Sequence, residues 1–239
     1  MTDDHKRSKI AGYYDDYSTW YEGERREGYY SLINDLEVER IQTYARGGDI
    51  LEIGVGTGLI LERTSRVATR AVGIDLSLGM AGVSKAKGLD VANASVNDLP
   101  FPDDSFDVAY SCKVLPHVPD IVGGLEELAR VVRPGGTMLV EFYNPLSFKG
   151  LTYRIMTRKR GHEPVFVRHD TVRDIEGYVP AGWHIEAVRG IRVLAATGQF
   201  YTAPVLGSLI RFLDRRLADS GIARRFGGYL LVTLRPDVG

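Results

Sequence analysis

The stretch DILEIGVGTGLIL, residues 49–61, constrains the fold more than any other part of the chain. Its first half is an apolar run typical of a buried strand, and this run leads directly into three glycines, Gly54, Gly56 and Gly58. A strand, a glycine-rich loop and a helix in this order place backbone N–H groups and a helix N-terminus against a ligand at the edge of a parallel sheet. Three glycines at alternating positions exceed what a tight turn requires, so the loop predicts a binding site.

The spacing of these glycines excludes two familiar nucleotide loops. A dinucleotide fingerprint, G-x-G-x-x-G, requires a glycine where this chain has Leu59. A P-loop requires Gly-Lys followed by Ser or Thr, and no such sequence follows. Glu52 lies in the strand just before the glycines, where its charge would repel a pyrophosphate. We therefore expect Glu52 to take part in an ammonium-binding network and the ligand to carry a cation.

The next predicted strand ends in Asp75. In sheets of this kind, an acidic side chain at that place accepts hydrogen bonds from the hydroxyls of a ribose. An aspartate at a strand end is, by itself, explained equally well as a capping residue. In combination with the glycine loop, we interpret Asp75 as a ribose ligand.

Strand-like and helix-like segments alternate along the middle of the chain, which is the order of a parallel sheet with helices on both faces. Helical spacing appears at residues 78–87 and 120–132, and the second segment stops at RPGG, where proline and glycine end a helix. We predict an α/β fold with a doubly wound, mostly parallel, seven-stranded sheet. The predicted strands are residues 49–54, 71–75, 90–95, 106–111, 137–143, 184–194 and 228–235.

A chain of 239 residues with 44% hydrophobic content suits one large domain. We predict a single domain over residues 1–239. Its parts are an N-terminal helical cap (1–36), a cofactor-binding core (37–144), a substrate cap inserted after the fifth strand (145–180), and C-terminal strands and a helix that complete the sheet (181–239).

Charge and composition exclude several classes of partner. Lys and Arg number 30 against 31 Asp and Glu, so the formal charge is −1 and no nucleic acid is expected. The single cysteine, Cys112, excludes an intrachain disulfide. The chain has no run of about 18 apolar residues, which predicts a soluble, cytoplasmic protein. No metal site is predicted, because the histidines are scattered: His5, His117, His162, His169 and His184.

Five motifs between residues 49 and 143 together resemble the class I S-adenosylmethionine-dependent methyltransferases, in the broad subgroup that acts on small molecules. The motifs are, in order, LEIGVGTG, GIDLSLGM, NDLPFPDDSFDVAYS, VLPHVPD and ELARVVRPGGTMLV. The resemblance implies that S-adenosylmethionine is the cofactor and that the glycine loop passes its amino acid and ribose portions. It also implies that Asp75 binds the ribose and that Leu76 and Met80 pack on the adenine.

The resemblance implies roles for further residues. Ser95 stands where such enzymes often have an aspartate that accepts from the adenine amino group; a Ser hydroxyl also accepts a hydrogen bond, or Asp98 takes this place. Val96 beside it offers a backbone N–H. Cys112 follows the fourth strand, under the methionine end of the cofactor, with a small apolar filler as the alternative. In YYDDYSTWYE, Tyr21 corresponds to an aromatic often found near the sulfonium.

The acceptor side is defined less well by the sequence. His117, in LPHVPD, lies in the turn after the fourth strand; a lone histidine is usually structural, but a hydroxyl or acidic-carbon acceptor needs a base, so His117 is our candidate general base. The basic segment 153–173 is either a solvated face or a site for an anionic acceptor. The residues predicted to bind the acceptor are Tyr17, Arg154, Arg158 and Arg168.

Residues 204–219 place apolar side chains on one helical face, which predicts core packing, with peripheral membrane contact as the alternative if that face is uncovered. The apolar residues are Leu206, Leu209, Ile210, Leu213 and Leu217.

We predict an enzyme that moves a methyl group from S-adenosylmethionine to an O, N or C atom of a small organic acceptor, from secondary or lipid metabolism. Two alternatives stay open. An RNA methyltransferase needs a larger basic groove than the one basic segment of this chain. A non-catalytic binding protein on the same fold would keep the glycine loop and fill the part of the pocket that faces the methyl group.

Overall fold

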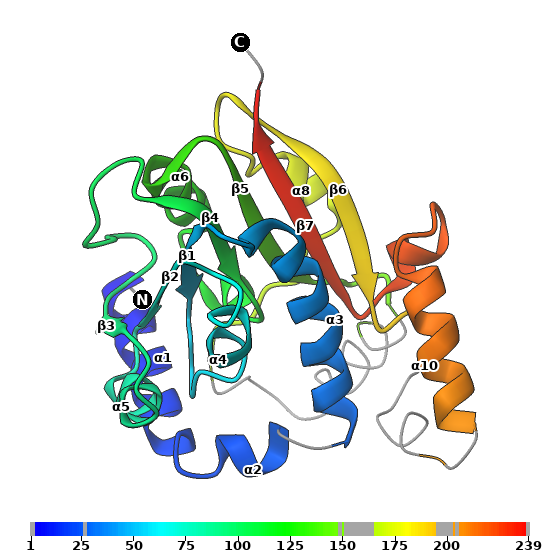
Figure 1. Cartoon of the computed structure of the whole chain (residues 1–239), viewed down its shortest axis with the longest axis horizontal. Coiled ribbons are helices and arrows are strands. Elements are labelled where there is room, and N and C mark those ends of the chain that lie inside the picture. Colours follow the sequence, from blue (N-terminus) through cyan, green and yellow to red (C-terminus); the bar gives the residue numbers. More distant parts are fainter. Residues whose placement is uncertain are drawn as a thin grey trace.

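The computed structural model describes residues 3–25, 28–147, 150, 165–194, 203 and 206–237. Its strands are β1 (Asp49–Ile53), β2 (Arg70–Asp75), β3 (Val91–Asn93), β4 (Phe106–Ser111), β5 (Val132–Tyr143), β6 (Trp183–Ile191) and β7 (Tyr229–Pro236). Within these residues they form one seven-stranded sheet in the order β3-β2-β1-β4-β5-β7-β6 (Figure 1).

The sheet is mostly parallel, as predicted. β1 pairs in parallel with β2 and β4, β2 with β3, and β4 with β5. The exception is β7, which runs antiparallel between β5 and β6. The central strands are buried on both faces, as their continuous apolar runs indicate: in β1 only the first residue, Asp49, is not fully buried.

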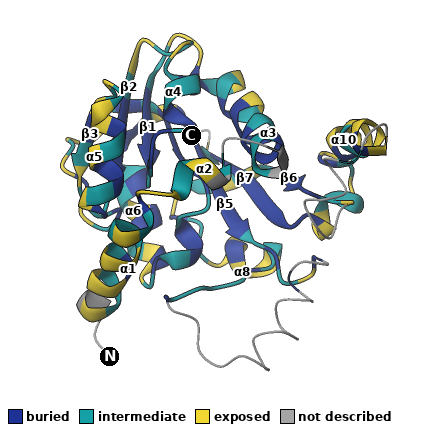
Figure 2. Cartoon of the chain, turned by 90° about the horizontal axis from the view of Figure 1, so that it is seen from below, coloured by how far each residue is buried: buried dark blue, intermediate teal, exposed yellow. Residues whose placement is uncertain are grey.

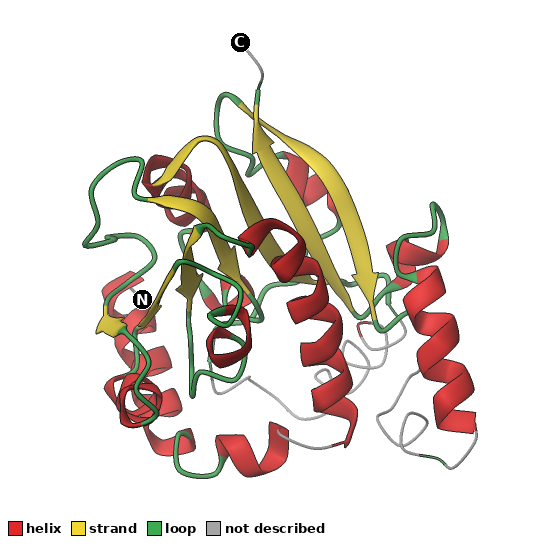
Figure 3. Cartoon of the chain, in the orientation of Figure 1, coloured by secondary structure: helices red, strands yellow, loops and turns green. Residues whose placement is uncertain are grey.

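Helices cover both faces of the sheet (Figures 1 and 3). α3 and α4 pack with one buried cluster and α6 and α8 with the other, so the sheet is doubly wound. No described helix is long and apolar enough to cross a membrane. The helices are α1 (Asp3–Tyr17), α2 (Tyr21–Arg25), α3 (Gly28–Ala45), α4 (Leu61–Thr64), α5 (Leu78–Ala86), α6 (Ile121–Val131), α8 (Val172–Glu176) and α10 (Leu206–Leu217), with short 3-10 helices η1 (Leu115–His117) and η2 (Ala223–Phe226).

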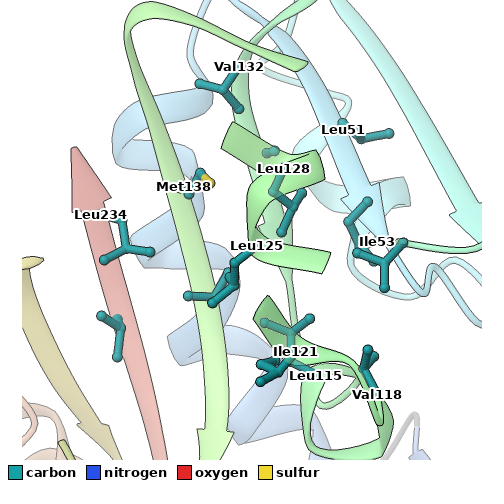
Figure 4. Close-up of a cluster of buried hydrophobic side chains, with 14 of the residues drawn as sticks. Leu51, Ile53, Leu115, Val118, Ile121, Leu125, Leu128, Val132, Met138 and Leu234 are labelled. Carbon is teal, nitrogen blue, oxygen red and sulfur yellow. The ribbon is translucent and has the colours of Figure 1, made fainter. Parts of the chain in front are cut away.

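The helix α6 illustrates how the sequence pattern builds the core. Asp120 caps its first turn by accepting a hydrogen bond from the Gly123 N–H at 3.0 Å. Ile121, Leu125 and Leu128, spaced four and three residues apart, share one face and are buried against the sheet (Figure 4). Burial of each such side chain is worth about 1.5–3 kcal/mol. The packing of this face holds α6 against the sheet and thereby fixes the position of the preceding turn, which contains η1.

Two strand boundaries differ from the prediction. α6 ends at Val131 near the predicted position, but β5 begins at once with Val132, so RPGG lies inside the strand. At Gly136 a Cβ would lie 2.8 Å from the carbonyl oxygen of Asp107, so only glycine allows this close approach to β4. The register of β4 and β5 shifts there between Phe106 and Val108. β3 is shorter than predicted, ending at Asn93.

Most of the apolar face predicted for α10 is not packed in the core: Leu206, Leu209 and Leu213 are exposed, whereas Ile210 packs against a buried cluster. Leu206, Leu209 and Phe212 are each about half exposed, with 49%, 52% and 54% of their surface accessible. The helix is held instead by Asp214, which is buried and accepts hydrogen bonds from the backbone N–H groups of Val193 and Leu194 at 2.7 and 3.0 Å. Figure 2 shows α10 at the edge of the molecule with much of its surface exposed.

This correction predicts a contrast between two leucines. Leu209→Ala in α10 removes a half-exposed side chain, so it should change the free energy of unfolding by less than about 0.5 kcal/mol. The matched control, Leu125→Ala in α6, leaves a cavity in the core and should cost about 2–5 kcal/mol. Urea unfolding of both variants measures the difference, and equal losses would mean that the α10 face is packed after all.

Candidate cofactor and acceptor pocket

A pocket, partly open to solvent, lies at the carboxyl ends of β1, β2 and β4, and its empty space of about 960 Å³ includes the open solvent at its mouth. The pocket brings together most of the residues that the sequence pointed to. The predicted residues that line it are Tyr21, Gly54, Gly56, Asp75, Leu76, Met80, Ser95, Val96, Cys112 and His117.

The glycine loop supplies one wall of the pocket. Gly54 has φ +68°, and a Cβ there would lie 2.2 Å from the side chain of Val114, so the loop packs too tightly for any other residue. Gly56 has φ +56°, and a Cβ there would meet only the ring of Tyr21 at 4.0 Å. The backbone of Gly56 is therefore accessible from the pocket. Gly58, the third predicted glycine, is not among the lining residues.

The carboxylate of Asp75 ties β2 to the loop after β1. Its Oδ2 accepts a hydrogen bond from the Gly56 N–H at 2.7 Å, and its Oδ1 accepts one from the Ser77 N–H at 2.8 Å. Burial raises the pKa of Asp75 above its usual value, although these two N–H donors oppose the shift. A carboxylate oxygen accepts more than one hydrogen bond, so each oxygen retains capacity for a ligand hydroxyl.

One face of α1 covers the pocket. Arg7, Ile10, Ala11 and Tyr14 line it, at the three- and four-residue spacing of a single helical face. The helix is held in place by Asp15, whose Oδ1 accepts hydrogen bonds from the Ser77 hydroxyl at 2.5 Å and the Gly79 N–H at 2.9 Å. The cap and the first turn of α5 are thereby joined directly.

The short helix α2 is anchored over the glycine loop. Glu22 forms an ion pair with Lys87, and the same ammonium donates to the carbonyl oxygen of Thr57 in the loop. This arrangement brings Tyr21 to Gly56. The predicted acceptor ligand Tyr17 does not line the pocket; its ring packs edge-on against Tyr21, with centroids 5.4 Å apart.

The far end of the pocket is shaped for a flat, mostly apolar group. The residues that line this end are Leu76, Met80 and, in the turn after β3, Ser95 and Val96. The hydroxyl oxygen of Ser95 accepts from the Asn97 N–H at 3.3 Å, so the hydroxyl hydrogen remains a donor. Asp98, the alternative to Ser95, is exposed and is not among the lining residues.

Glu52 lies behind the pocket instead of lining it. The side chain is buried, and its Oε2 accepts a hydrogen bond from the Tyr110 hydroxyl at 3.1 Å, which in turn lies 2.7 Å from the Thr64 hydroxyl. Burial raises the pKa of Glu52 well above its usual value. Because Glu52 is not among the lining residues, it supports the glycine loop from behind and does not contact an ammonium group of a ligand.

A second buried cluster lies below the end of β4. The Lys113 ammonium is 2.6 Å from the Glu37 carboxylate of α3, and Glu141 and Cys112 lie beside this pair. Burial lowers the pKa of Lys113, but the charges of Glu37 and Glu141 more than reverse this, so the ammonium remains charged. Burial raises the pKa of Glu141 and of Cys112 well above their usual values. The cluster thus holds the Lys113–Glu37 ion pair beside a buried thiol and a second buried carboxyl group.

His117 is fixed in one orientation at the acceptor side. Its Nδ1 lies 2.9 Å from the carbonyl oxygen of Phe166; because a carbonyl only accepts, Nδ1 carries the proton. In the neutral ring this leaves the lone pair on Nε2, which is 3.4 Å from the Tyr143 hydroxyl. The rings of Tyr14 and Tyr143 pack edge-on against the imidazole, with centroids 6.0 and 5.7 Å away.

The predicted basic acceptor residues do not meet in the pocket. Arg154 and Arg158 lie outside the described residues. Arg168 is not among the lining residues; its guanidinium pairs with Asp170 at 3.0 Å and donates to the Tyr178 hydroxyl at 2.5 Å.

Sequence reasoning missed Arg25, Lys113 and Tyr143, which also line the pocket. Tyr143 could have been found, since it ends the fifth predicted strand at the same sheet edge as Asp75. Lys113 has φ +64°, a conformation that its sequence does not indicate. Arg25 belongs to a short helix whose packing follows from the whole fold.

Comparisons with known proteins identify a methyltransferase domain in this chain. Residues 51–140 match the model of a methyltransferase domain family. The chain is 35% identical over 117 residues to a demethylmenaquinone methyltransferase of Tropheryma whipplei, covering 47% of this chain and 49% of that protein. It is 30% identical to an uncharacterized protein of Methanocaldococcus jannaschii, covering 62% of this chain and 67% of that protein. The chain thus spans about half the length of the demethylmenaquinone methyltransferase it matches.

The fold has solved counterparts. An S-adenosylmethionine-dependent methyltransferase of Thermotoga maritima aligns with a TM-score of 0.68 at 19% identity, covering 96% of this chain and 99% of that one. Residues 51–140 thus form a methyltransferase domain within a chain that has the methyltransferase fold, and this match implies S-adenosylmethionine as the cofactor. The pocket fits this cofactor, because Asp75 retains acceptor capacity toward a ribose and an apolar slot lies beside it.

The buried Glu52 predicts a pH dependence of stability. Because its pKa is raised in the folded state, its contribution is fully present below the unfolded pKa of about 4.3 and is lost as pH rises toward the folded pKa. Relative to Glu52→Gln, which keeps an acceptor for Tyr110, the wild type should lose up to about 1.4 kcal/mol per pH unit in that window. Urea unfolding between pH 5 and 8 measures this, with the exposed Glu62→Gln as control. Parallel curves for wild type and Glu52→Gln would contradict the assignment.

Proposed function

We propose that this chain transfers a methyl group from S-adenosylmethionine to a small organic acceptor held between α1, η1 and the end of β5. The observation that carries the proposal is the continuity of one pocket from Asp75, through Gly56, to His117 and Tyr143. The lining continues beyond the cofactor part to His117, Tyr143 and Tyr14, which argues against a non-catalytic protein with a filled acceptor side.

S-adenosylmethionine, when bound, supplies a methyl group on a positively charged sulfonium. The protein's own contribution is to align the acceptor and exclude water. The face of α1 and the ring of Tyr21 cover the pocket, and aromatic rings suit a neighbouring cation. Burial raises the pKa of Tyr14, so its phenol stays neutral and serves as a hydrogen-bonding wall.

His117 is proposed as the general base for an acceptor that must lose a proton. Its Nδ1–H is held by the Phe166 carbonyl, so Nε2 presents the lone pair on the side of Tyr143. The Tyr143 hydroxyl, at 3.4 Å, is placed to pass a proton to that nitrogen or to orient the ring. A base so positioned serves O- or C-methylation, whereas an amine acceptor needs alignment alone.

The acceptor is proposed to be a small molecule with an aromatic or apolar body. The side of the pocket near His117 is walled by Tyr14, Tyr143, Val114 and Ile10, which suits a ring or a hydrocarbon better than a polar chain. The relative named as a demethylmenaquinone methyltransferase fits this chemistry without establishing it here. An RNA acceptor is less well supported, since the formal charge of the chain is −1 and a nucleic-acid-binding protein usually carries an extended basic surface.

The first prediction concerns the cofactor. S-adenosylmethionine and S-adenosylhomocysteine should bind, whereas NAD and ATP should not. Asp75→Ala removes the proposed ribose acceptor and should weaken binding by about 1.5–3 kcal/mol, the worth of hydrogen bonds to a charged group. Isothermal titration calorimetry measures this, with the exposed Asp90→Ala as matched control. Tight NAD binding without S-adenosylhomocysteine binding would rule out the proposed function.

The second prediction concerns His117. With an acceptor that must be deprotonated, His117→Gln should lower kcat by about 10²–10⁴, while the affinity for S-adenosylhomocysteine stays within about threefold. His184→Gln, at an exposed histidine paired with Asp237, is the control and should leave kcat unchanged. A His117→Gln enzyme with near wild-type kcat would make this residue structural and favour transfer to an atom that is already nucleophilic.

A further inference from the structure

Arg25 places a positive charge on the acceptor side of the pocket. It is the last residue of α2 and lines the pocket beyond Tyr21. Its guanidinium carbon lies 4.6 Å from the ring centre of Tyr21 and 4.6 Å from that of Tyr30. No carboxylate of the described residues pairs with Arg25, and its buried Nε has no hydrogen-bond acceptor. A guanidinium remains charged at any physiological pH, so Arg25 can bind an anionic group of a ligand.

The stacking determines which part of Arg25 is left to bind. The two tyrosine rings lie against the guanidinium, and its N–H donors point outward in the guanidinium plane. Such an edge matches the two oxygens of a planar carboxylate, which accepts a pair of parallel hydrogen bonds. The ring contacts also hold the guanidinium in place before a ligand arrives, which reduces the entropy lost on binding.

The surroundings of Arg25 belong to the acceptor half. Its other electrostatic neighbours are Tyr143, at the end of β5, and Tyr229, at the start of β7, whose rings lie 5.5 Å apart. Asp75 lies at the end of β2, on the other side of β1 and β4 in the sheet. The other basic groups differ: Lys113 is already paired with Glu37, and Arg7, whose buried Nε also has no acceptor, approaches from α1 without a described ring on either side.

We propose that Arg25 binds a carboxylate of the methyl acceptor, so that the acceptor class is a small carboxylic acid with an aromatic or hydrocarbon body. This inference rests on the proposed function, since it assigns the acceptor half of the same pocket. The rings of Tyr14 and Tyr143 then contact the aromatic or hydrocarbon body of the acceptor. The guanidinium edge of Arg25 fixes the orientation of the acceptor relative to His117. An anionic acceptor is also attracted by the cationic sulfonium beside it.

The experiment compares each carboxylate with its neutral, nearly isosteric amide. The probes are benzoate against benzamide and octanoate against octanamide, titrated by calorimetry into the full chain saturated with S-adenosylhomocysteine. In the wild type, at least one carboxylate should bind about 10- to 100-fold more tightly than its amide, the range for a charged hydrogen-bonded pair. Arg25→Met should remove this preference and leave the amide affinity within about threefold. Arg66→Met, at a side chain that is 69% exposed, is the matched control.

Each outcome decides a separate point. If S-adenosylhomocysteine does not bind the wild type, both the proposed function and this inference are wrong. If it binds but neither carboxylate is preferred over its amide, only the role of Arg25 is wrong. A preference that Arg25→Met keeps and Arg7→Met removes would also overturn the assignment. If Arg25→Met weakens S-adenosylhomocysteine by the same factor as the carboxylate, the guanidinium serves the amino acid carboxylate of the cofactor instead.

Discussion

The pocket depends on the carboxylate of Asp75. This group holds the Gly56 N–H with one oxygen and the Ser77 N–H with the other, so the loops after β1 and β2 are joined at one point. The Ser77 hydroxyl continues the connection to Asp15 of α1. The position of the covering helix and the conformation of the glycine loop are therefore linked through a chain of short, charge-assisted hydrogen bonds. Displacing either end would disturb the oxygens that face the ligand.

Charge is distributed unevenly around this pocket. Below β4, the ammonium of Lys113 is paired with Glu37, and burial raises the pKa values of the adjoining Glu141 and Cys112. Burial likewise raises the pKa of Glu52 behind the glycine loop. Arg25 differs from Lys113, because no carboxylate of the described residues pairs with its guanidinium.

The centre of the sheet could be predicted because β1, β4 and β7 are buried on both faces and their sequences are therefore mostly apolar. The residues that line the pocket from strand ends, such as Asp75 and Cys112, follow from the same logic. Glu52 could not be placed correctly, since its burial beside Tyr110 follows from the pairing of β1 with β4, a strand distant in sequence. The covering face of α1 was missed because Arg7 and Tyr14 interrupt its apolar residues. For α10, an amphipathic pattern indicates a helix but not which of its faces is packed.

The antiparallel strand β7 has a consequence for the biosynthesis of this chain. It lies in the interior of the sheet, between β5 and β6, although it comes last of the seven strands in sequence. Until residues 229–236 have left the ribosome, β5 presents an open edge of backbone donors and acceptors. Pairing across so long a stretch of chain is slow. Nascent molecules of this chain should therefore depend on chaperones that shield an unfinished sheet.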